Sequence, residues 1–418
     1  MNSNFLKSQS LILSLIPFFL ITGPLFSDLA FSIVVIFTTI YMLKKKQYQY
    51  FQNKFVLCFS IFYFYLLINS FFINPTFDSI KNSVLYFRFG LFSICFWFLL
   101  DQDKFLLKKI FIVMFFCFLL LIIDGFIQFY FKTNIFGFEL SETGRVSSVF
   151  NTELILGSYL SRLFPIFFGI SILLYNEKKN VLILISIIFI LVEVLIFMSG
   201  GRAAIFYMNL SAIYIILCIK NFKKFRIITL IISMILIIII SVFNPSYKER
   251  VVDLTVKQMG INSEDKNEKK YIFSEEHTNH YLSAKKMFDT NILFGVGVRN
   301  FKNLCNKDDY KVSETSCSTH PHNTYVQLLA ETGILGFLII FSFFIYLLKI
   351  TFVYLFYSPK KVNILYDFQV CIVSAMMISL WPLIPNGNFF NNWLSIVYYL
   401  PIGIFLWTIK NNKKIQQN

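Results

Sequence analysis

The residue in this 418-residue chain best suited to acid–base chemistry is His322, which stands in the string STHPHNTYVQLLAETGILGF at the start of an apolar segment. A helix N-terminus disfavours positive charge, so a histidine there stays neutral, and a neutral imidazole can take a proton from a hydroxyl group. Gly333 lies eleven residues further on, about three turns, and hence on the same predicted helix face. There it would let a neighbouring helix or a lipid chain approach closely. Taken alone, His322 is explained equally well as a helix-capping or interfacial residue.

The other three histidines, His277, His280 and His320, precede His322 in the same part of the chain. Their H-x-x-H and H-x-H spacing raises the alternative of a zinc site. No cysteine or aspartate stands nearby with a recognised ligand spacing, so we expect no metal ion. No other cofactor is expected either.

An amphipathic helix is expected from Ser274 onward, with two glutamates in its first turn. Tyr281, Ala284 and Phe288 share one face of this helix, which would pack on the membrane surface or cover a cavity. The histidines at 277 and 280 are then interpreted as ordinary residues of that helix.

Two of the seven cysteines, Cys305 and Cys317, lie in the polar stretch that contains the histidines. In an oxidising compartment they could form a disulfide, which would stabilise this stretch by about 3 kcal/mol; the alternative is two free thiols. The other five cysteines lie in apolar segments and are interpreted as small apolar residues.

The composition excludes an ordinary soluble enzyme. Hydrophobic residues make up 56% of the chain and charged residues 15%, against roughly 45–50% and about 25% in soluble domains. The net charge of +15 would suggest a nucleic-acid partner in a soluble protein. Here the lysines follow the membrane topology, so no nucleic-acid partner is expected.

We predict an all-α polytopic membrane protein with about twelve transmembrane helices, since a helix needs about 20 mostly apolar residues to cross a bilayer. Residues 1–243 contain nine spans, residues 244–320 form one long polar loop, and residues 321–418 contain three more, all in a single integral membrane domain. The expected spans are 10–26, 28–43, 55–73, 82–100, 110–131, 152–175, 181–198, 203–219, 226–243, 322–348, 364–383 and 392–409.

Lysine clusters such as 44–46 and 220–224 alternate with connections that carry few positive charges. Because cytoplasmic loops carry the excess of Lys and Arg, this pattern places both termini in the cytoplasm and residues 244–320 outside. Of the seven arginines, Arg226 alone falls on the inner side. The outer arginines are Arg88, Arg145, Arg162, Arg202, Arg250 and Arg299.

The outer arginines could bind phosphate or carboxylate groups, because a planar guanidinium makes paired hydrogen bonds to either. Salt bridges and snorkelling toward lipid headgroups are the alternative. Charges within spans usually face a cavity or each other. Six charged residues map to the outer halves of their spans and suggest a hydrated cavity open to the outside, although a structural ion-pair network would give the same pattern. They are Arg88, Asp124, Glu153, Arg162, Glu193 and Arg202.

The string HPHNTYVQLLAETGILG resembles the signature of the O-antigen ligase and polymerase family of bacterial membrane glycosyltransferases. In it, His322 and Gly333 match the family's H-x10-G pattern. The strings GRVSSVFNTELILGSYL, MSGGRAAIF and MFDTNILFGVGVRNF are also similar to this family, as is the layout of twelve spans with a long outer loop before the last three. The family's Ser-Arg-Gly string reads Ser199-Gly200-Gly201-Arg202-Ala203 here, with the arginine displaced by glycines.

This resemblance implies transfer of a glycan from an undecaprenyl-pyrophosphate carrier to an acceptor hydroxyl at the periplasmic face of the inner membrane. A ligase would use lipid A–core as the acceptor, and a polymerase would use a second lipid-linked glycan. The resemblance further implies a fold like the glycosyltransferase C class, with no nucleotide and no metal ion. His322 would be the base, and Arg145, Arg202 and Arg250 would bind the pyrophosphate, with Arg250 matched only by its approximate position.

The H-x10-G pattern favours a ligase over a polymerase, and attack opposite the leaving group would invert the anomeric centre. Two other classes of function remain as alternatives. A transporter of lipid-linked sugars could also hold a pyrophosphate with outer arginines, although transporters often contain inverted repeats and midplane charges, neither of which is visible here. A structural membrane scaffold is the third alternative, and the charges within the spans argue against it.

Overall fold

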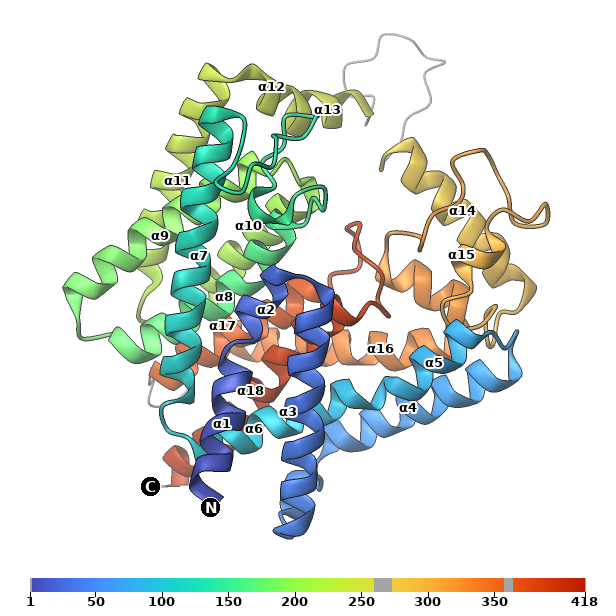
Figure 1. Cartoon of the computed structure of the whole chain (residues 1–418), viewed down its shortest axis with the longest axis horizontal. Helices are drawn as coiled ribbons and strands as arrows, with labels where there is room; N and C mark the ends of the chain where they lie inside the picture. Colours follow the sequence, from blue (N-terminus) through green and yellow to red (C-terminus); the bar gives the residue numbers. More distant parts are fainter. Residues whose placement is uncertain (1, 259–272, 357–363, 418) are drawn as a thin grey trace.

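The computed structural model describes residues 2–258, 273–356 and 364–417, and over these residues the chain is all-α, with no strand (Figure 1). A single β-bridge joins Thr133 to Glu139 in the connection after α7. The predicted class, an all-α polytopic membrane protein, is confirmed.

Each of the twelve expected spans corresponds to a helix or a pair of helices in the described residues. Nine of these helices or pairs are long and apolar enough to cross a membrane. They are α3 (Pro24–Lys44), α4 (Lys54–Phe72), α5 with α6 (Phe77–Leu85 and Phe87–Gln102), α7 (Leu106–Phe131), α8 (Leu156–Tyr175), α9 (Lys179–Met198), α11 (Lys223–Phe243), α16 (Thr324–Phe356) and α18 (Asn392–Gln417).

The remaining three expected spans are shorter or bent. The first is a pair, α1 (Asn2–Ser14) and α2 (Ile16–Thr22), bent by 45°. The other two are α10 (Arg202–Cys218) and α17 (Ile364–Ser379). Helix α17 ends earlier than expected, because Pro382 disfavours helical conformation in the residue before it.

Helix α8 lies at the centre of the bundle, and nearly all of its residues from 156 to 172 are buried. It packs against α17, α9, α10 and α7, while α18 packs against α6 and α17. By contrast, α11 exposes a row of isoleucines, as expected of a helix that faces lipid. The core of this membrane protein is therefore built around α8, α17 and α18.

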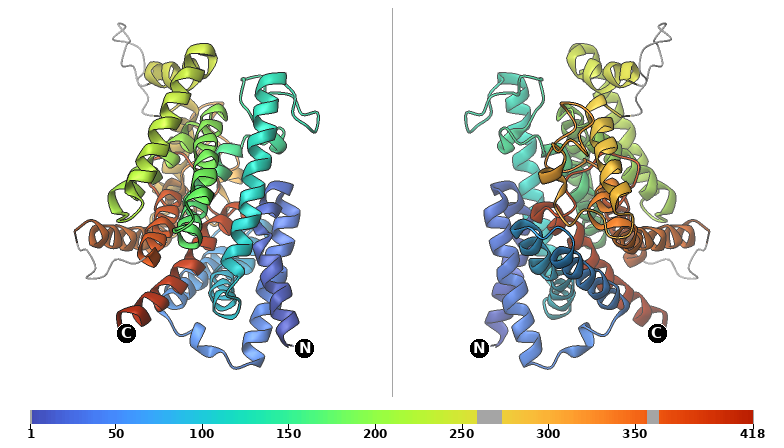
Figure 2. Two further views of the ribbon diagram at one scale, coloured as in Figure 1. Left: turned by 90° about the vertical axis from the view of Figure 1, so that its left-hand side faces the viewer. Right: turned by 90° about the vertical axis from the view of Figure 1, so that its right-hand side faces the viewer.

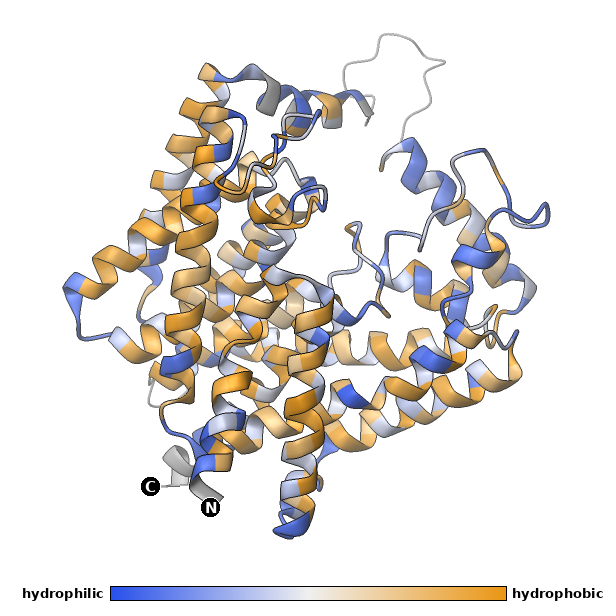
Figure 3. Cartoon of the chain, viewed as in Figure 1, coloured by the Kyte–Doolittle hydropathy of each residue, from blue (hydrophilic) through white to orange (hydrophobic). Residues whose placement is uncertain are grey.

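Both chain termini lie at one end of the molecule, and α12 (Pro245–Lys248) and α13 (Leu254–Gln258) lie at the opposite end (Figures 1 and 2). Between these two short helices is a π-helical segment, Glu249–Asp253. Hydrophilic residues gather over α12, α13, α14 (Glu275–Thr290) and α15 (Phe301–Leu304) (Figure 3). This arrangement agrees with a topology in which the termini share one side and the described residues between 244 and 320 share the other. The compartment of each side stays a prediction.

The amphipathic helix predicted from Ser274 is confirmed as α14. The hydroxyl oxygen of Ser274 accepts the backbone N–H of His277 and caps the helix. The buried face of α14, which includes Ala284 and Met287, packs against α16 rather than on a membrane surface.

Gly333 breaks α16, with φ +61°. The preceding segment 291–297 crosses this break and supplies backbone partners. Val296 and Gly297 donate to the carbonyls of residues 330 and 331, and the N–H of Ile334 donates to the carbonyl of Ile292. A side chain at Gly333 would collide with the backbone of Leu293. The close approach predicted at Gly333 is thus made by a loop, and not by a helix or lipid chain.

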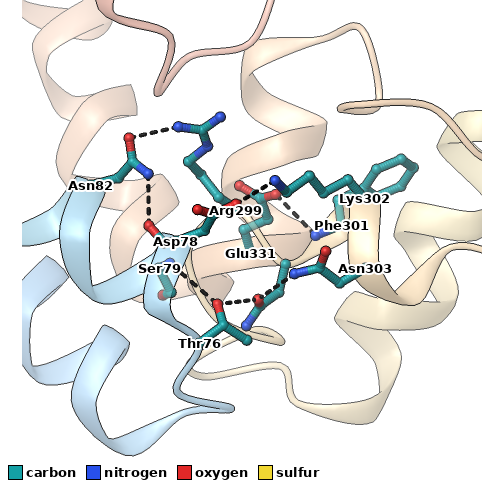
Figure 4. Close-up of polar contacts among 10 residues, drawn as sticks. Thr76, Asp78, Ser79, Asn82, Arg299, Phe301, Lys302, Asn303 and Glu331 are labelled. Carbon is teal, nitrogen blue, oxygen red and sulfur yellow. Dashed lines mark hydrogen bonds and ion pairs between the residues drawn. The ribbon is translucent and has the colours of Figure 1, made fainter.

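A polar network holds the next residues, 299–303, between α5 and α16 (Figure 4). Arg299 donates to the side chain of Asn82 at 2.6 Å, and Lys302 forms an ion pair with Asp78. The backbone N–H of Phe301 donates to the buried carboxylate of Glu331 at 3.1 Å. Arg299, one of the outer arginines, therefore fastens this loop to α5.

Candidate functional site

His322 lies just before α16 and not within its first turn. The helix is capped by the next residue, Asn323, whose side-chain oxygen accepts the backbone N–H groups of Tyr325 and Val326. His322 itself has φ +55°, a left-handed conformation that non-glycine residues seldom adopt. The expectation that His322 and Gly333 share a helix face was therefore wrong, because His322 precedes the cap.

The structure gathers the other three histidines of the chain around His322. Ring centroids lie 4.1 Å from His322 for His320, 5.2 Å for His277 and 5.3 Å for His280. His277 and His280 belong to α14, and His320 and His322 belong to the segment before α16. Sequence reasoning missed the contribution of α14, although the spacing of three residues places its two histidines on one face.

Within the described residues, no group of three or more His, Cys, Asp or Glu side chains has the arrangement of a metal site. The four histidines instead differ in the hydrogen bonds that their rings make. The Nε2 of His320 lies 3.3 Å from the carbonyl oxygen of Asn386, and its Nδ1 lies 2.9 Å from the hydroxyl of Thr319. A carbonyl only accepts, so His320 is protonated on Nε2. Among the described residues, no ring nitrogen of His322 has a hydrogen bond; the Nδ1 of His280 also has none, but it is buried. His322 is only half-buried, so it is the histidine with free nitrogens that is open to a substrate.

The environment of the cluster keeps the imidazoles neutral. Burial lowers the pKa of His322 to about 3, with further lowering from the neighbouring imidazoles, foremost that of His320. Burial also lowers the pKa of His320 to about 4, against the opposing effect of its hydrogen bond to Asn386. Burial likewise lowers the pKa values of His277 and His280. At ordinary pH each ring has the uncharged form that a base requires.

Arg145 and Arg250 meet around the glycines that separate α9 from α10. The Nε of Arg145 donates to the carbonyl of Ser199 at 2.7 Å, and the Nε of Arg250 donates to the carbonyl of Gly200 at 3.3 Å. A side chain at Gly200 would come within 3.0 Å of both arginines, so the glycine permits their approach. Arg202 begins α10 directly after this turn. The structure therefore brings together the three arginines singled out in the sequence.

The electrostatics of these arginines reflect their proximity. Burial lowers the pKa of Arg145 to about 10, and the charge of Arg250 lowers it further. Burial and then the charge of Arg202 lower the pKa of Arg250. Across the described residues, neither Arg145 nor Arg250 forms an ion pair with a carboxylate. A dianionic ligand would find at Arg145 and Arg250 positive charge that no carboxylate of the described residues pairs with.

The arginine cluster adjoins the histidine cluster through Arg202 and His277. After burial and the neighbouring His280, the positive charge of Arg202 is the next cause that lowers the pKa of His277. Arg202 also donates to the hydroxyl of Thr255 on α13 at 3.3 Å. The cationic cluster is therefore close enough to the neutral histidines for its charge to act on His277.

Two of the charges predicted to line a cavity form structural ion pairs instead. Arg88 pairs with Asp28 on α3 at 3.2 Å. Glu193 pairs with Arg226, both almost completely buried, and also accepts the hydroxyl of Ser233. Arg226 was assigned to the inner side, yet its long side chain reaches a carboxylate assigned to the outer half of α9. These pairs tie α3 to α6 and α9 to α11.

The two other acidic residues of that set have different surroundings. The carboxylate of Asp124 is buried and accepts hydrogen bonds from Ser148 at 2.6 Å and Asn134 at 3.2 Å, which hold the loop after α7. Glu153 is exposed in the connection before α8, outside any span. The structure does not bring the predicted charges into one cavity, since each has its own set of neighbours.

Arg162 is the remaining member of that set, and it approaches the histidine segment through Asn386. Its guanidinium is buried, donates to the side-chain oxygen of Asn386 at 2.7 Å and to the hydroxyl of Ser379 at 3.3 Å. It also lies over the rings of Tyr207 and Tyr398, 4.6 and 5.6 Å from their centroids. Among the described residues it forms no ion pair with a carboxylate.

Cys305 and Cys317 are joined in a disulfide, with their Cα atoms 5.0 Å apart. Cys305 ends α15 and is buried against α14 and α16, while Cys317 lies three residues before His320. The bond closes the loop that leads into the histidine segment. It thereby limits how far this segment can move from α14.

A family model described as O-antigen ligase matches residues 184–341. The matched range runs from α9 into α16 and includes Arg202, Arg250 and all four histidines. The match supports the family that the sequence motifs indicated. Arg145, Arg162 and Asn386 lie outside the matched range. No curated protein matches the chain.

Proposed function

We propose that this chain, a relative of the O-antigen ligases and polymerases, transfers a glycan from an undecaprenyl-pyrophosphate carrier to an acceptor hydroxyl at the periplasmic face of the inner membrane. The observation that carries the proposal is the cluster around His322, in which the ring of His277 lies 5.2 Å from that of His322 and the charge of Arg202, beside the other arginines around Gly200, lowers the pKa of His277. The family match supports a glycosyltransferase-like enzyme that acts on lipid-linked glycans in a membrane.

Arg145, Arg202 and Arg250 would bind the pyrophosphate of the donor. Guanidinium groups make paired, charge-assisted hydrogen bonds to phosphate oxygens. The N-terminus of α10 adds to this, because Gly201 caps the helix without a side-chain hydrogen bond and the helix dipole favours an anion there. Negative charge on the pyrophosphate grows as the bond to the sugar breaks, so these groups stabilise the transition state more than the bound donor.

His322 would act as the general base. The acceptor oxygen attacks the anomeric carbon while the bond from that carbon to the pyrophosphate oxygen breaks. The electron pair leaves with undecaprenyl pyrophosphate, and the hydroxyl proton passes to His322. Attack from the side opposite the leaving group inverts the anomeric centre. A bound pyrophosphate also raises the pKa of His322 from its value of about 3, because a nearby negative charge favours the protonated ring.

The positive charge for the leaving group comes from arginines in this scheme, and the donor itself supplies the energy. The proposal therefore includes no metal ion and no nucleotide. Retention of transfer activity in the presence of EDTA would support the first of these points, and restoration of lost activity by a divalent cation would contradict it.

The lipid part of the donor needs an apolar path beside these polar groups. An apolar groove between α16, α17 and α18 supports this requirement. Its lining includes Phe343, Met376 and Ile402, together with Ser379 and Tyr398, which contact Arg162 or Asn386. We propose that the chain is a single integral membrane domain in which residues 244–320 are periplasmic and hold the site against the membrane.

We favour a ligase that uses lipid A–core, because His322 and Gly333 match H-x10-G, and keep a repeat-unit polymerase as the second candidate. The test is the glycan gel profile of a strain lacking this gene, complemented with the wild type or with His322→Ala. Loss of surface glycan together with long lipid-linked chains identifies a ligase. A single repeat unit on lipid A–core identifies a polymerase. Normal banding with His322→Ala contradicts the proposal, and blocked translocation of the carrier across vesicles indicates a transporter.

A further inference from the structure

Asn386 lies in the connection between α17 and α18, far in sequence from the histidines, and contacts both members of the H-P-H segment. Its backbone N–H donates to the carbonyl of His322 at 2.7 Å. Its own carbonyl accepts from the Nε2 of His320 at 3.3 Å. One residue outside the matched family range thus binds the backbone of one histidine and the ring of the other.

Both the oxygen and the NH2 group of the Asn386 side chain form hydrogen bonds. Its oxygen accepts from Arg162 at 2.7 Å, and its NH2 group donates to the hydroxyls of Thr324 at 3.1 Å and Tyr398 at 2.9 Å. Arg162 can only donate, so the oxygen of the amide must face it. The residue is buried, with 7% of its surface exposed, so these bonds form away from water and fix its backbone as well.

We infer that Asn386 is a positioning residue, which holds His322 in its left-handed backbone conformation and His320 in its Nε2-protonated form. The inference rests on the proposed role of His322 as the base. The hydrogen bond to the carbonyl of His322 offsets the unfavourable φ of +55°. The bond to His320 occupies that ring, so the two neighbouring histidines are not interchangeable and the proton goes to His322.

Arg162 anchors this arrangement through its own burial. A guanidinium buried without a carboxylate partner needs neutral acceptors and aromatic faces to compensate for lost water. The oxygen of Asn386 is its nearest acceptor, at 2.7 Å. The hydrogen bond from Arg162 therefore restrains Asn386, and Asn386 in turn restrains the histidine segment.

The first experiment measures the reactivity of the histidines with diethylpyrocarbonate by mass spectrometry, in the purified full-length protein. In the wild type, we expect fast modification of His322 and slow modification of His320, whose nitrogens both have hydrogen-bond partners. Asn386→Ala should raise the rate for His320 several-fold. Asn388→Ala is the matched control, because this neighbouring asparagine contacts Gln327 and Phe390 but neither histidine. Unchanged rates in Asn386→Ala, or the same change in both variants, would overturn the inference.

The second experiment measures glycan transfer. A displaced base lowers kcat, so Asn386→Ala should reduce kcat by about 10- to 100-fold while KM for the donor stays within about two-fold. Asn386→Asp keeps an oxygen for Arg162, so it should recover part of kcat, and its negative charge should move the acidic limb of the pH profile to higher pH. A merely structural loss would lower the amount of folded protein and leave this pH profile unchanged, which would also overturn the inference.

The two experiments separate failure of the inference from failure of the proposed function. If His322→Ala retains full transfer activity but Asn386→Ala still changes the labelling of His320, the base assignment is wrong and the positioning is real. If His322→Ala is inactive and Asn386→Ala changes neither labelling nor kcat, the base assignment stands and Asn386 positions nothing.

Discussion

Two polar regions of the molecule use similar residues in different ways. In the network that fastens residues 299–303, Arg299 has Asn82 as a partner and Lys302 has Asp78 (Figure 4). At the candidate site, Arg145 and Arg250 donate to backbone carbonyls and pair with no carboxylate in the described residues. The first region pairs its lysine with a carboxylate and its arginine with a neutral amide, and these contacts fasten the loop to α5. The second leaves positive charge for a ligand, which is why we assign function to it.

The largest effect is expected when the proposed base, His322, is removed from the candidate site. His322→Ala should lower the transfer rate by about 10²- to 10⁴-fold, the usual contribution of a general base. Membrane insertion should be unchanged, since the backbone hydrogen bond from Asn386 does not use the ring. The measurement is transfer from a purified lipid-linked donor, with the folded fraction checked by size-exclusion chromatography. His277→Ala serves as a control for general disturbance of the cluster, and a loss as large as that in His322→Ala would contradict our choice of base.

The next largest effect is expected from the arginines. Arg145→Ala should lower kcat/KM by about 10²- to 10³-fold, as removal of one preorganised group that stabilises transition-state charge does. Arg145→Lys should recover little, because an ammonium cannot make the paired hydrogen bonds of a guanidinium.

Arg299→Ala is the matched control, an outer arginine of the fastening network. It should reduce thermal stability more than it reduces kcat/KM of the folded protein. If Arg145→Ala and Arg299→Ala lower thermal stability and kcat/KM in the same proportion, the distinction between the two regions fails.

The sequence predicted the helical segments and the amphipathic helix α14 well, because each depends on local apolar periodicity and capping. It also singled out Arg145, Arg202 and Arg250, which the structure gathers. What it could not predict depends on tertiary contacts between distant elements. The partner of Glu193 is Arg226, more than thirty residues away and assigned to the other side of the membrane. The role of Asn386 has no local signal, since the residues that it joins are far away in sequence: His320 is 66 residues away and Arg162 is 224 residues away.

A smaller effect on catalysis, but a clear one on stability, is expected at the Glu193–Arg226 pair. Glu193→Gln leaves a buried guanidinium without its counter-charge, which should destabilise the protein by about 3–5 kcal/mol. The rate of the folded fraction should change little, because the pair ties α9 to α11 and is not part of the site. Thermal unfolding in detergent measures the first quantity. Lys285→Ala, which breaks an exposed ion pair on α14, is the control and should shift the transition hardly at all.

The smallest expected effect is the response of the free enzyme to pH. An ordinary histidine base loses activity as the pH falls through about 6.5. Burial and three neighbouring imidazoles lower the pKa of His322 to about 3, and a group with a lowered pKa keeps its neutral form until the pH approaches that value. The dependence of kcat/KM on pH, which reports the free enzyme, should therefore be nearly flat between pH 8 and about pH 5. The dependence of kcat should fall at higher pH than that of kcat/KM, because the bound pyrophosphate raises the pKa of the same ring. If the acidic limbs of both profiles coincide near pH 6.5, the base is not a histidine of the buried cluster. The contrast between the candidate site and the network around residues 299–303 then no longer identifies the catalytic region.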